Sequence, residues 1–266
     1  EPLSANLEHD NTPWPLPDGR ILYMRWEYVD RSQVDYHHLW TMNADGTAQM
    51  TYFGNMHPGG VYIDAKPIPG TGEVIMINSP GHGIREHIGH VAIVSPKRGP
   101  DHLPSLRNLT GNGFRDPYPL TSDLFMAAQA RSIMLLGRDG EPVVLYELED
   151  AERSLELHEP RPLRSRPREH LIPPQVKPEK TTGQLILADV HAGRRMEGVE
   201  KGDIASLLVL ESLPKPINYT GGMDPLSYGG TFTLERVLGT VPVEDDGSAY
   251  MELPALRSLF FVALDE

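Results

Sequence analysis

Short runs of apolar and β-branched residues, separated by glycine- and proline-rich turns, recur along the first half of the chain. The clearest unit consists of a turn at 17–20, an apolar run at 21–24, a second run at 39–43, an Asp-Gly turn at 44–47 and a closing strand at 48–51. Glycine accepts the positive φ that a tight hairpin turn needs, so this pattern predicts antiparallel strands. So small a sheet buries too little surface to be stable alone, which predicts stacking against similar units.

Two further units repeat this order of strands and turns. They place strands at 62–68, 73–78, 90–94 and 106–110, and then at 124–128, 132–137 and 143–148. A spacing of about 40–50 residues is typical of propeller blades. Because propellers close with about four to eight blades, three units predict a partial β-propeller. Residues 1–16 are polar and rich in proline, and we expect them to form a loop.

The pattern changes after residue 157. Residues 158–181 are dense in proline and arginine, which favours an extended, polyproline-like segment over a sheet. Longer strand-like runs follow at 184–190, 204–211, 231–243, 248–253 and 258–264. We therefore predict an all-β chain with propeller blades over 1–157, a connector over 158–181 and a β-sandwich-like domain over 182–266. We expect that domain to be truncated at its C-terminus, and the chain to be a piece of a longer protein.

Composition narrows the function classes. The formal net charge of -13 argues against nucleic acid as a partner, because no broad basic face could neutralise phosphates. The chain has no cysteine, which excludes disulfides, thiolate metal sites, thiol nucleophiles and covalent haem attachment within these residues. No window reaches the roughly 18 apolar residues of a membrane-spanning helix. The sequence also lacks a Gly-x-Ser-x-Gly nucleophile motif and a phosphate-binding glycine loop.

Four stretches carry a resemblance to known families. Residues 39–47, Leu-Trp-Thr-Met-Asn-Ala-Asp-Gly-Thr, resemble the blade signature of TolB-type propellers. Residues 79–87, 158–169 and 239–266 are together similar to proteins of the hydrazine synthase alpha subunit-like family, and this resemblance covers nearly the whole chain. It implies an exported, periplasmic protein with a TolB/WD40-like propeller followed by further domains. It also implies haem c attachment through a Cys-x-x-Cys-His motif, expected only in a downstream region of the parent protein.

Three functions are consistent with these features. The first is a scaffold module of an exported, haem-associated oxidoreductase-like protein that is not itself catalytic, with other domains of the parent chain or partner subunits as its partners. The second is a propeller that binds a ligand or a protein without catalysis. The third is a metal-dependent hydrolase that uses histidines of the second unit.

Those histidines are His82, His87 and His90, on or next to a glycine-punctuated loop. Imidazoles so close in sequence could converge on one cation, since neutral imidazole binds zinc, copper and iron. Alternatively, each imidazole braces the loop through separate bonds to backbone carbonyls.

Arg161, Arg164, Arg166 and Arg168 form the densest basic cluster of this acidic chain. The planar guanidinium suits carboxylates and phosphates, which makes the cluster a candidate for binding an acidic ligand or haem propionates. The alternative is that these arginines pair with nearby acidic residues and fix the connector in place.

Asp64, Asp116 and Asp123 lie near predicted strand starts or turns. Propellers often place such residues around a central channel, where calcium or a substrate can bind. Aspartates at these positions also commonly accept hydrogen bonds from turn amides, and we favour that interpretation.

Overall fold

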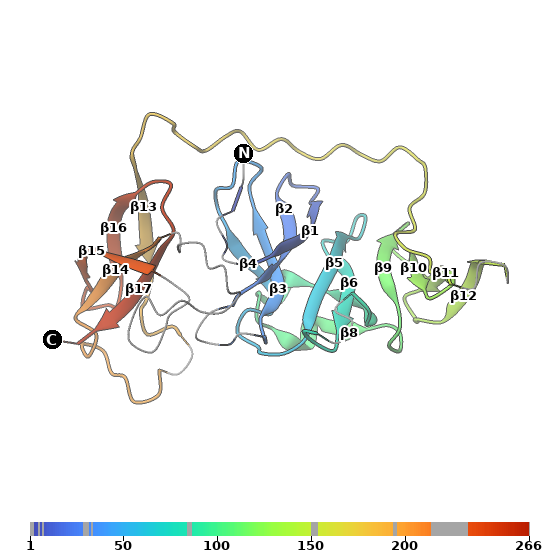
Figure 1. Cartoon of the computed structure of the whole chain (residues 1–266), viewed down its shortest axis with the longest axis horizontal. Coiled ribbons are helices and arrows are strands. Elements are labelled where there is room, and N and C mark those ends of the chain that lie inside the picture. The colour runs from blue at the N-terminus through green and yellow to red at the C-terminus, as the bar shows by residue number, and fades with distance from the viewer. Residues whose placement is uncertain are drawn as a thin grey trace. The chain divides into compact units, whose positions relative to one another are not determined.

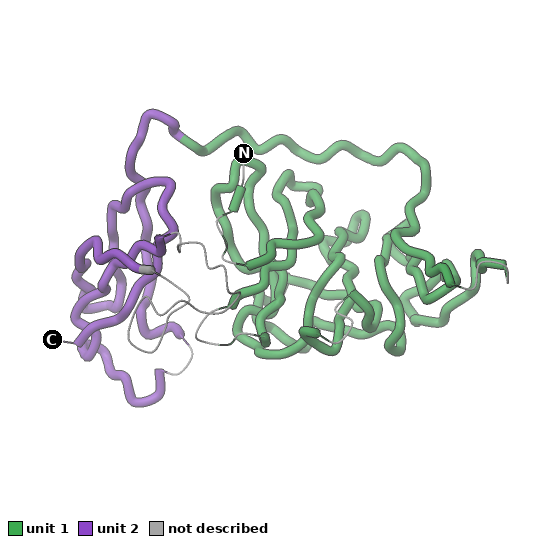
Figure 2. The backbone as a smooth tube through the Cα atoms, viewed as in Figure 1, with its two compact units in different colours: residues 1–176 green, residues 177–266 purple. Residues whose placement is uncertain are grey.

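The computed structural model describes residues 3, 4, 6, 8–28, 32, 34–83, 87–149, 154–193, 196–213 and 234–265. The chain divides into two compact units, residues 1–176 and residues 177–266 (Figure 2). The described residues form β-strands and two short 3-10 helices, η1 (Pro96–Arg98) and η2 (Leu103–Ser105), and contain no α-helix. The predicted all-β class is therefore confirmed. None of the helices in this described part has the length and apolar character that crossing a membrane requires.

Three four-stranded antiparallel meanders make up the first unit (Figure 1). The first meander consists of β1 (Asp10–Pro15), β2 (Ile21–Trp26), β3 (His37–Met42) and β4 (Met50–Phe53); the second of β5 (Val61–Pro67), β6 (Val74–Ser79), β7 (His90–Val94) and β8 (Leu106–Asn108); the third of β9 (Arg115–Pro119), β10 (Leu124–Gln129), β11 (Ser132–Gly137) and β12 (Pro142–Glu147). A single parallel pairing, His37 with Val61, joins β3 to β5. Each predicted unit thus forms one meander.

Buried aliphatic and aromatic side chains join the meanders to one another. One hydrophobic cluster contains Met24 of β2, Ile75 of β6 and Phe125 of β10, so all three meanders contribute to it. A second cluster joins the first two meanders through residues such as Leu39 and Val74. This packing agrees with the expectation that no unit is stable alone. The arrangement of the meanders as propeller blades stays a prediction.

Two strands lie where the sequence predicted none. β1 falls within the predicted loop at 1–16, and β9 falls within an unassigned stretch. Both are rich in proline, which lacks the backbone N–H that a strand between two neighbours must donate. Among the described residues, β1 pairs with β2 and β9 pairs with β10, so each strand has an open side on which proline is tolerated.

A short motif recurs in the first strand of each meander and once more in the connector. Its copies are Thr12-Pro13-Trp14-Pro15-Leu16, Asp64-Ala65-Lys66-Pro67-Ile68, Asp116-Pro117-Tyr118-Pro119-Leu120 and Glu159-Pro160-Arg161-Pro162-Leu163. The first residue of every copy has a positive φ, between 46° and 57°. Residues other than glycine rarely adopt this backbone conformation. It accompanies a register shift in each of the three strands. The motif therefore introduces the same irregularity into the first strand of each meander.

The first part of the predicted connector, residues 158–176, belongs to the first unit; we call it the strap. Arg164 donates to the carbonyl of Leu120 in the third meander. Farther along, the backbone N–H of His170 donates to Pro17 O at 3.1 Å, in the first meander. The N–H of Gln175 donates to Asp45 Oδ2 at 2.6 Å, also in the first meander. The strap thus runs from the third meander to the first, and it contains no regular strand.

The second unit contains two small sheets. Its strands are β13 (Thr182–Leu187), β14 (Ser206–Leu213), β15 (Leu234–Pro242), β16 (Ala249–Pro254) and β17 (Leu259–Leu264). One sheet pairs β13 with β16, and the other has the order β15-β14-β17. Leu207 and Val209 of β14 pack against Ala249 and Met251 of β16, so one apolar cluster lies between the sheets as in a β-sandwich.

A buried carboxylate holds the three-stranded sheet of this unit together. The side chain of Glu211 on β14 is 4% exposed and binds Arg236 of β15 and Arg257 before β17. Arg257 Nη1 donates to Glu211 Oε1 at 2.9 Å, and Arg236 Nε donates to Oε2 at 2.9 Å. The hydrogen bond from Arg236 is the main cause that lowers the pKa of Glu211 below its ordinary value of 4.5.

We expect these ion pairs to stabilise the second unit only while Glu211 is ionised. A group whose pKa is lowered in the folded state contributes stability that is fully present above its ordinary pKa, here 4.5. That stability is lost as the pH falls through the lowered folded-state pKa. Amide hydrogen exchange of β14, β15 and β17 should therefore be faster in Glu211→Gln than in the wild type at neutral pH. The two proteins should converge well below pH 4.5. If the exchange rates of the two proteins differ as much well below pH 4.5 as at neutral pH, the ionised Glu211 is not the source of the stabilisation.

Candidate functional site

The repeated motif brings one side chain from each of its copies to a common place in the first unit. These are Trp14, Lys66, Tyr118 and Arg161, each two residues after the positive-φ position. The rings of Trp14 and Tyr118 lie 6.1 Å apart in an edge-to-face arrangement. Lys66 Nζ lies 5.3 Å from the centre of the Trp14 ring, and the Arg161 guanidinium lies 5.0 Å from it. Trp14 is therefore the shared neighbour of the other three side chains.

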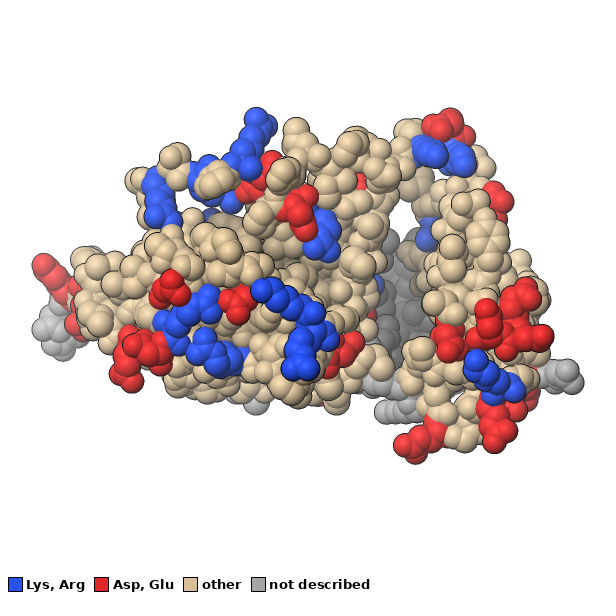
Figure 3. Space-filling view, turned by 180° about the vertical axis from the view of Figure 1, so that it is seen from behind, with Lys and Arg blue, Asp and Glu red and all other residues tan. Residues whose placement is uncertain are grey.

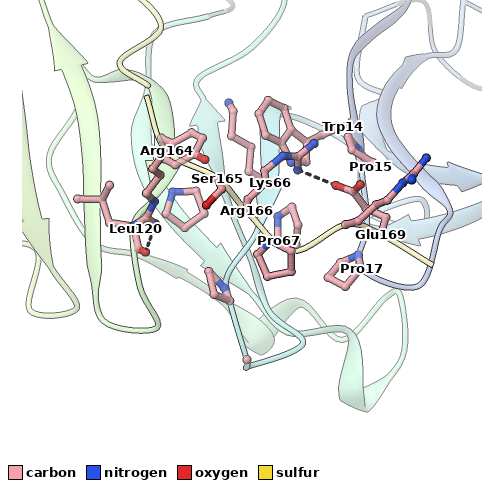
Figure 4. Close-up of a pocket in the computed structure, with 16 residues that line it drawn as sticks. Trp14, Pro15, Pro17, Lys66, Pro67, Leu120, Arg164, Ser165, Arg166 and Glu169 are labelled. Atoms are coloured by element: carbon pink, nitrogen blue, oxygen red, sulfur yellow. Dashed lines mark hydrogen bonds and ion pairs between the residues drawn. The ribbon is translucent and has the colours of Figure 1, made fainter. Parts of the chain in front are cut away.

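A pocket of about 430 Å³ lies beside this group (Figure 4). Its lining combines Trp14, Lys66 and Tyr118 with the strap arginines Arg166 and Arg168. The remaining wall consists largely of prolines, among them those at 15, 17, 67, 69, 119 and 167. Its volume falls in the range of small-molecule sites, which are mostly apolar with a few placed polar groups. We call it the central pocket.

Lys66 is the buried cation of the site, with 4% of the residue exposed. Burial lowers the pKa of Lys66 below its ordinary value of 10.5, and the carboxylates of Asp64, Glu159 and Asp116 oppose that shift. Its Nζ donates to the main-chain carbonyl of Asp64 at 3.3 Å. Lys66 therefore belongs both to the central pocket and to the surroundings of three carboxylates.

Those carboxylates are the motif's first residues in three of its copies. Asp64, Asp116 and Glu159 each offer an oxygen, and the three oxygens lie within 4.8 Å of one another; we call them the acidic cluster. Asp64 and Asp116 are buried, whereas Glu159 is exposed. The backbone N–H of Glu159 donates to Asp116 Oδ2 at 3.0 Å, and that of Asp64 donates to Thr12 Oγ1 at 3.2 Å. Asp116 thus accepts a backbone amide of the strap, a distant segment, where the sequence interpretation favours a turn amide.

Two histidines flank the acidic cluster. His158 Nδ1 lies 3.3 Å from Asp116 Oδ2, and Arg115 Nη1 lies 2.9 Å from His158 Nε2. Because arginine can only donate, Nε2 accepts, and the imidazole proton sits on Nδ1 facing Asp116. On the other side, His87 Nδ1 lies 3.6 Å from Asp64 Oδ2.

The histidines predicted to bind a metal have different surroundings. His82 lies against the rings of Trp26 and His37, with centroids 4.6 Å and 5.1 Å away. His87 lies next to Asp64, and His90 Nδ1 lies 2.9 Å from the carbonyl of Thr110. The structure therefore does not bring the three imidazoles to one point. Among the described residues, the acidic cluster alone has three metal-competent ligand atoms within 4.8 Å of one another.

Three of the strap arginines form ion pairs or hydrogen bonds within the first unit. Arg161 pairs with Glu159, Arg166 Nη1 lies 2.7 Å from Glu169 Oε1, and Arg164 donates to a backbone carbonyl. These contacts match the alternative in which the arginines fix the connector. Arg164, Arg166 and Arg168 nevertheless line the central pocket, so binding of an acidic ligand there stays a prediction.

The third predicted aspartate lies outside the site. Asp123 Oδ1 lies 3.1 Å from Arg138 Nε on an exposed turn, away from the group formed by Asp64 and Asp116. Sequence reasoning missed Trp14, Lys66, Tyr118 and Glu159 as site residues. The recurring Pro-Leu or Pro-Ile at the end of each motif copy is the signal that aligns them.

Comparison with known proteins gives a match in fold to a solved structure. No family model and no curated protein sequence matches this chain. The solved structure of hydrazine synthase from Kuenenia stuttgartiensis is similar in fold. The TM-score is 0.76 and the sequence identity 20%, over 99% of this chain and 41% of that one. The chain therefore has the fold of one part of a hydrazine synthase chain, and it spans less than half of that chain's length. At this identity the likeness concerns the fold.

Proposed function

We propose that this chain is a non-catalytic scaffold and binding module of a larger, exported, haem-associated protein with hydrazine synthase-like architecture. The fold similarity supports this architecture, with the three meanders acting as propeller blades. In this proposal any haem c is carried by a region downstream, and the module works in the periplasm with other domains or subunits. The separate surroundings of His82, His87 and His90 favour a binding role over the metal-dependent hydrolase.

The observation that carries the binding role is the composition of the central pocket. Its lining combines the aromatic side chains of Trp14 and Tyr118 with the cations Lys66, Arg166 and Arg168. Aromatic surface favours a flat ligand, and ammonium and guanidinium groups favour a carboxylate. Because Lys66 is buried, its attraction for an anion is screened less than that of a surface lysine. The ligand class is therefore a small, planar carboxylate.

Fluorescence titration tests this class, because Trp14 lies in the pocket wall. We expect benzoate to change the tryptophan emission with saturation, and benzamide, which has the same shape without the charge, to bind at least about tenfold more weakly. Arg168→Ala and Lys66→Met should each weaken benzoate binding by about tenfold or more. Lys97→Met, which removes an exposed cation outside the pocket, should leave it unchanged. Equal binding of both compounds, or no effect of either pocket variant, would refute the proposal.

Charge on the surface agrees with a small anionic ligand better than with a polyanion. On the face drawn in Figure 3, lysine and arginine side chains lie interleaved with acidic ones. A nucleic acid needs a broad basic face, and the described residues on this view offer none. The basic side chains of the central pocket instead line a volume of about 430 Å³.

A further inference from the structure

We propose that the acidic cluster is a binding site for a divalent cation, with calcium as the matching chemistry. Asp64, Asp116 and Glu159 supply the ligand oxygens from β5, β9 and the start of the strap. None of its three carboxylates lines the proposed carboxylate pocket, although Lys66 lies beside both.

The spacing of the donors suits a hard cation. Calcium binds carboxylate oxygens at about 2.3–2.6 Å, so two oxygens on opposite sides of the ion lie about 4.8 Å apart. All three oxygens of the acidic cluster lie within 4.8 Å of one another, so a single ion can contact all of them. The donors are all oxygens, which favours calcium over the softer transition metals that select imidazole or thiolate.

Asp64 supplies an independent reason to place a cation there. The residue is 3% exposed, and its Oδ2 is buried and accepts no hydrogen bond within the described part of the chain. The nearest imidazole nitrogen, His87 Nδ1, is 3.6 Å away, which is too long for a hydrogen bond. Burying a carboxylate oxygen that accepts no hydrogen bond is unfavourable, and a cation bound by the Asp64 carboxylate would offset that cost.

The charged side chains near the acidic cluster, among the described residues, do not neutralise all three of its carboxylates. Lys66 directs its Nζ to the main-chain carbonyl of Asp64, at 3.3 Å. Arg161 pairs with Glu159, and Arg115 pairs with Glu156 outside the cluster. Among the described residues, the lysine and arginine side chains beside the three carboxylates are Lys66 and Arg161, so the carboxylates outnumber them.

The motif explains how distant segments converge on the ion. Each ligand opens its motif copy with a positive φ, 57° at Asp64, 51° at Asp116 and 48° at Glu159. The corresponding position of the first meander is Thr12, whose hydroxyl accepts the amide of Asp64 and so fixes that ligand's backbone. Three of the four copies thus carry carboxylates, and the fourth positions one of them.

Calorimetric titration of the chelator-treated full chain with calcium chloride tests the site. We expect one saturable calcium per chain, and an affinity at least about tenfold lower in Asp64→Asn and in Glu159→Gln, because calcium affinity follows the number of charged ligands. Asp123→Asn is the matched control, since it removes an exposed aspartate of the same unit outside the cluster. It should bind like the wild type, and so should Arg168→Ala, which removes a pocket arginine.

Thermal unfolding separates a cation site from a purely structural cluster. Bound calcium should raise the midpoint of the wild type and leave that of Asp64→Asn unchanged. In chelator, Asp64→Asn should be at least as stable as the wild type, because it removes a buried charge. Glu159 is exposed, so Glu159→Gln keeps the test valid if the Asp64 variant fails to fold. Absence of saturable calcium binding, or unchanged affinity in the variants that fold, would overturn the proposal.

Discussion

Gly140→Ala should destabilise the first unit by about 2–5 kcal/mol, the sum of a left-handed backbone penalty and a steric clash. Gly140 lies in the turn between β11 and β12 and has a φ of 82°. An ideal Cβ at this position would lie 1.8 Å from the carbonyl oxygen of Leu109, just after β8 of the second meander. A backbone carbonyl cannot move aside as a flexible side chain can, so the two meanders would have to separate locally.

Tryptophan fluorescence in a urea titration measures this loss selectively, because Trp14, Trp26 and Trp40 all belong to the first unit. The matched control is Gly72→Ala in the turn between β5 and β6. Gly72 has a φ of 72° but no atom within 4 Å of its ideal Cβ, so only the backbone penalty of about 1–2 kcal/mol applies. Equal losses in the two variants would show that the turn of the third meander does not pack on the second.

The sequence was sufficient to predict most strands of both units. Alternating apolar runs beside Asp-Gly turns identify hairpins because the signal is local, and β7 and β11 have the predicted bounds. β1 and β9 were missed because their prolines oppose a strand in isolation. Only the knowledge that each strand has one open side makes proline compatible with the sheet, and that is a property of the assembled unit.

The candidate site was harder to predict, because convergence of side chains from separate segments is a tertiary property. His82, His87 and His90 are close in sequence, yet the structure gives each a different neighbour. Asp64 and Asp116 are far apart in sequence, yet they lie together because both open the same motif. Alignment of the motif copies is sequence information and would have added Glu159. The burial of Asp64 Oδ2 without a hydrogen bond from the described residues, however, is visible only in the packed structure.

Phe125→Ala should cost the first unit about 3–5 kcal/mol, the usual loss for truncating a fully buried aromatic side chain. Phe125 on β10 is 0% exposed and belongs to the cluster that also contains Met24 and Ile75. The cavity would therefore weaken contacts of the third meander with both of the others. Val143→Ala on β12 is the control, because Val143 is 63% exposed and its truncation should change stability by about 0.5 kcal/mol or less.

The same urea titration decides whether the three meanders unfold together. None of the three tryptophans lies in the third meander, although Trp14 contacts its Tyr118 and Trp26 packs on the shared cluster. Cooperative unfolding of the unit therefore appears as one transition of the tryptophan emission, and Phe125→Ala lowers its midpoint. We expect the midpoint to shift with an unchanged slope, since the slope follows the surface exposed on unfolding. Repeat proteins are stabilised largely by the interfaces between neighbouring repeats, which predicts this coupling. An unchanged midpoint would instead mean that the third meander unfolds independently and that the shared cluster does not join it to its neighbours.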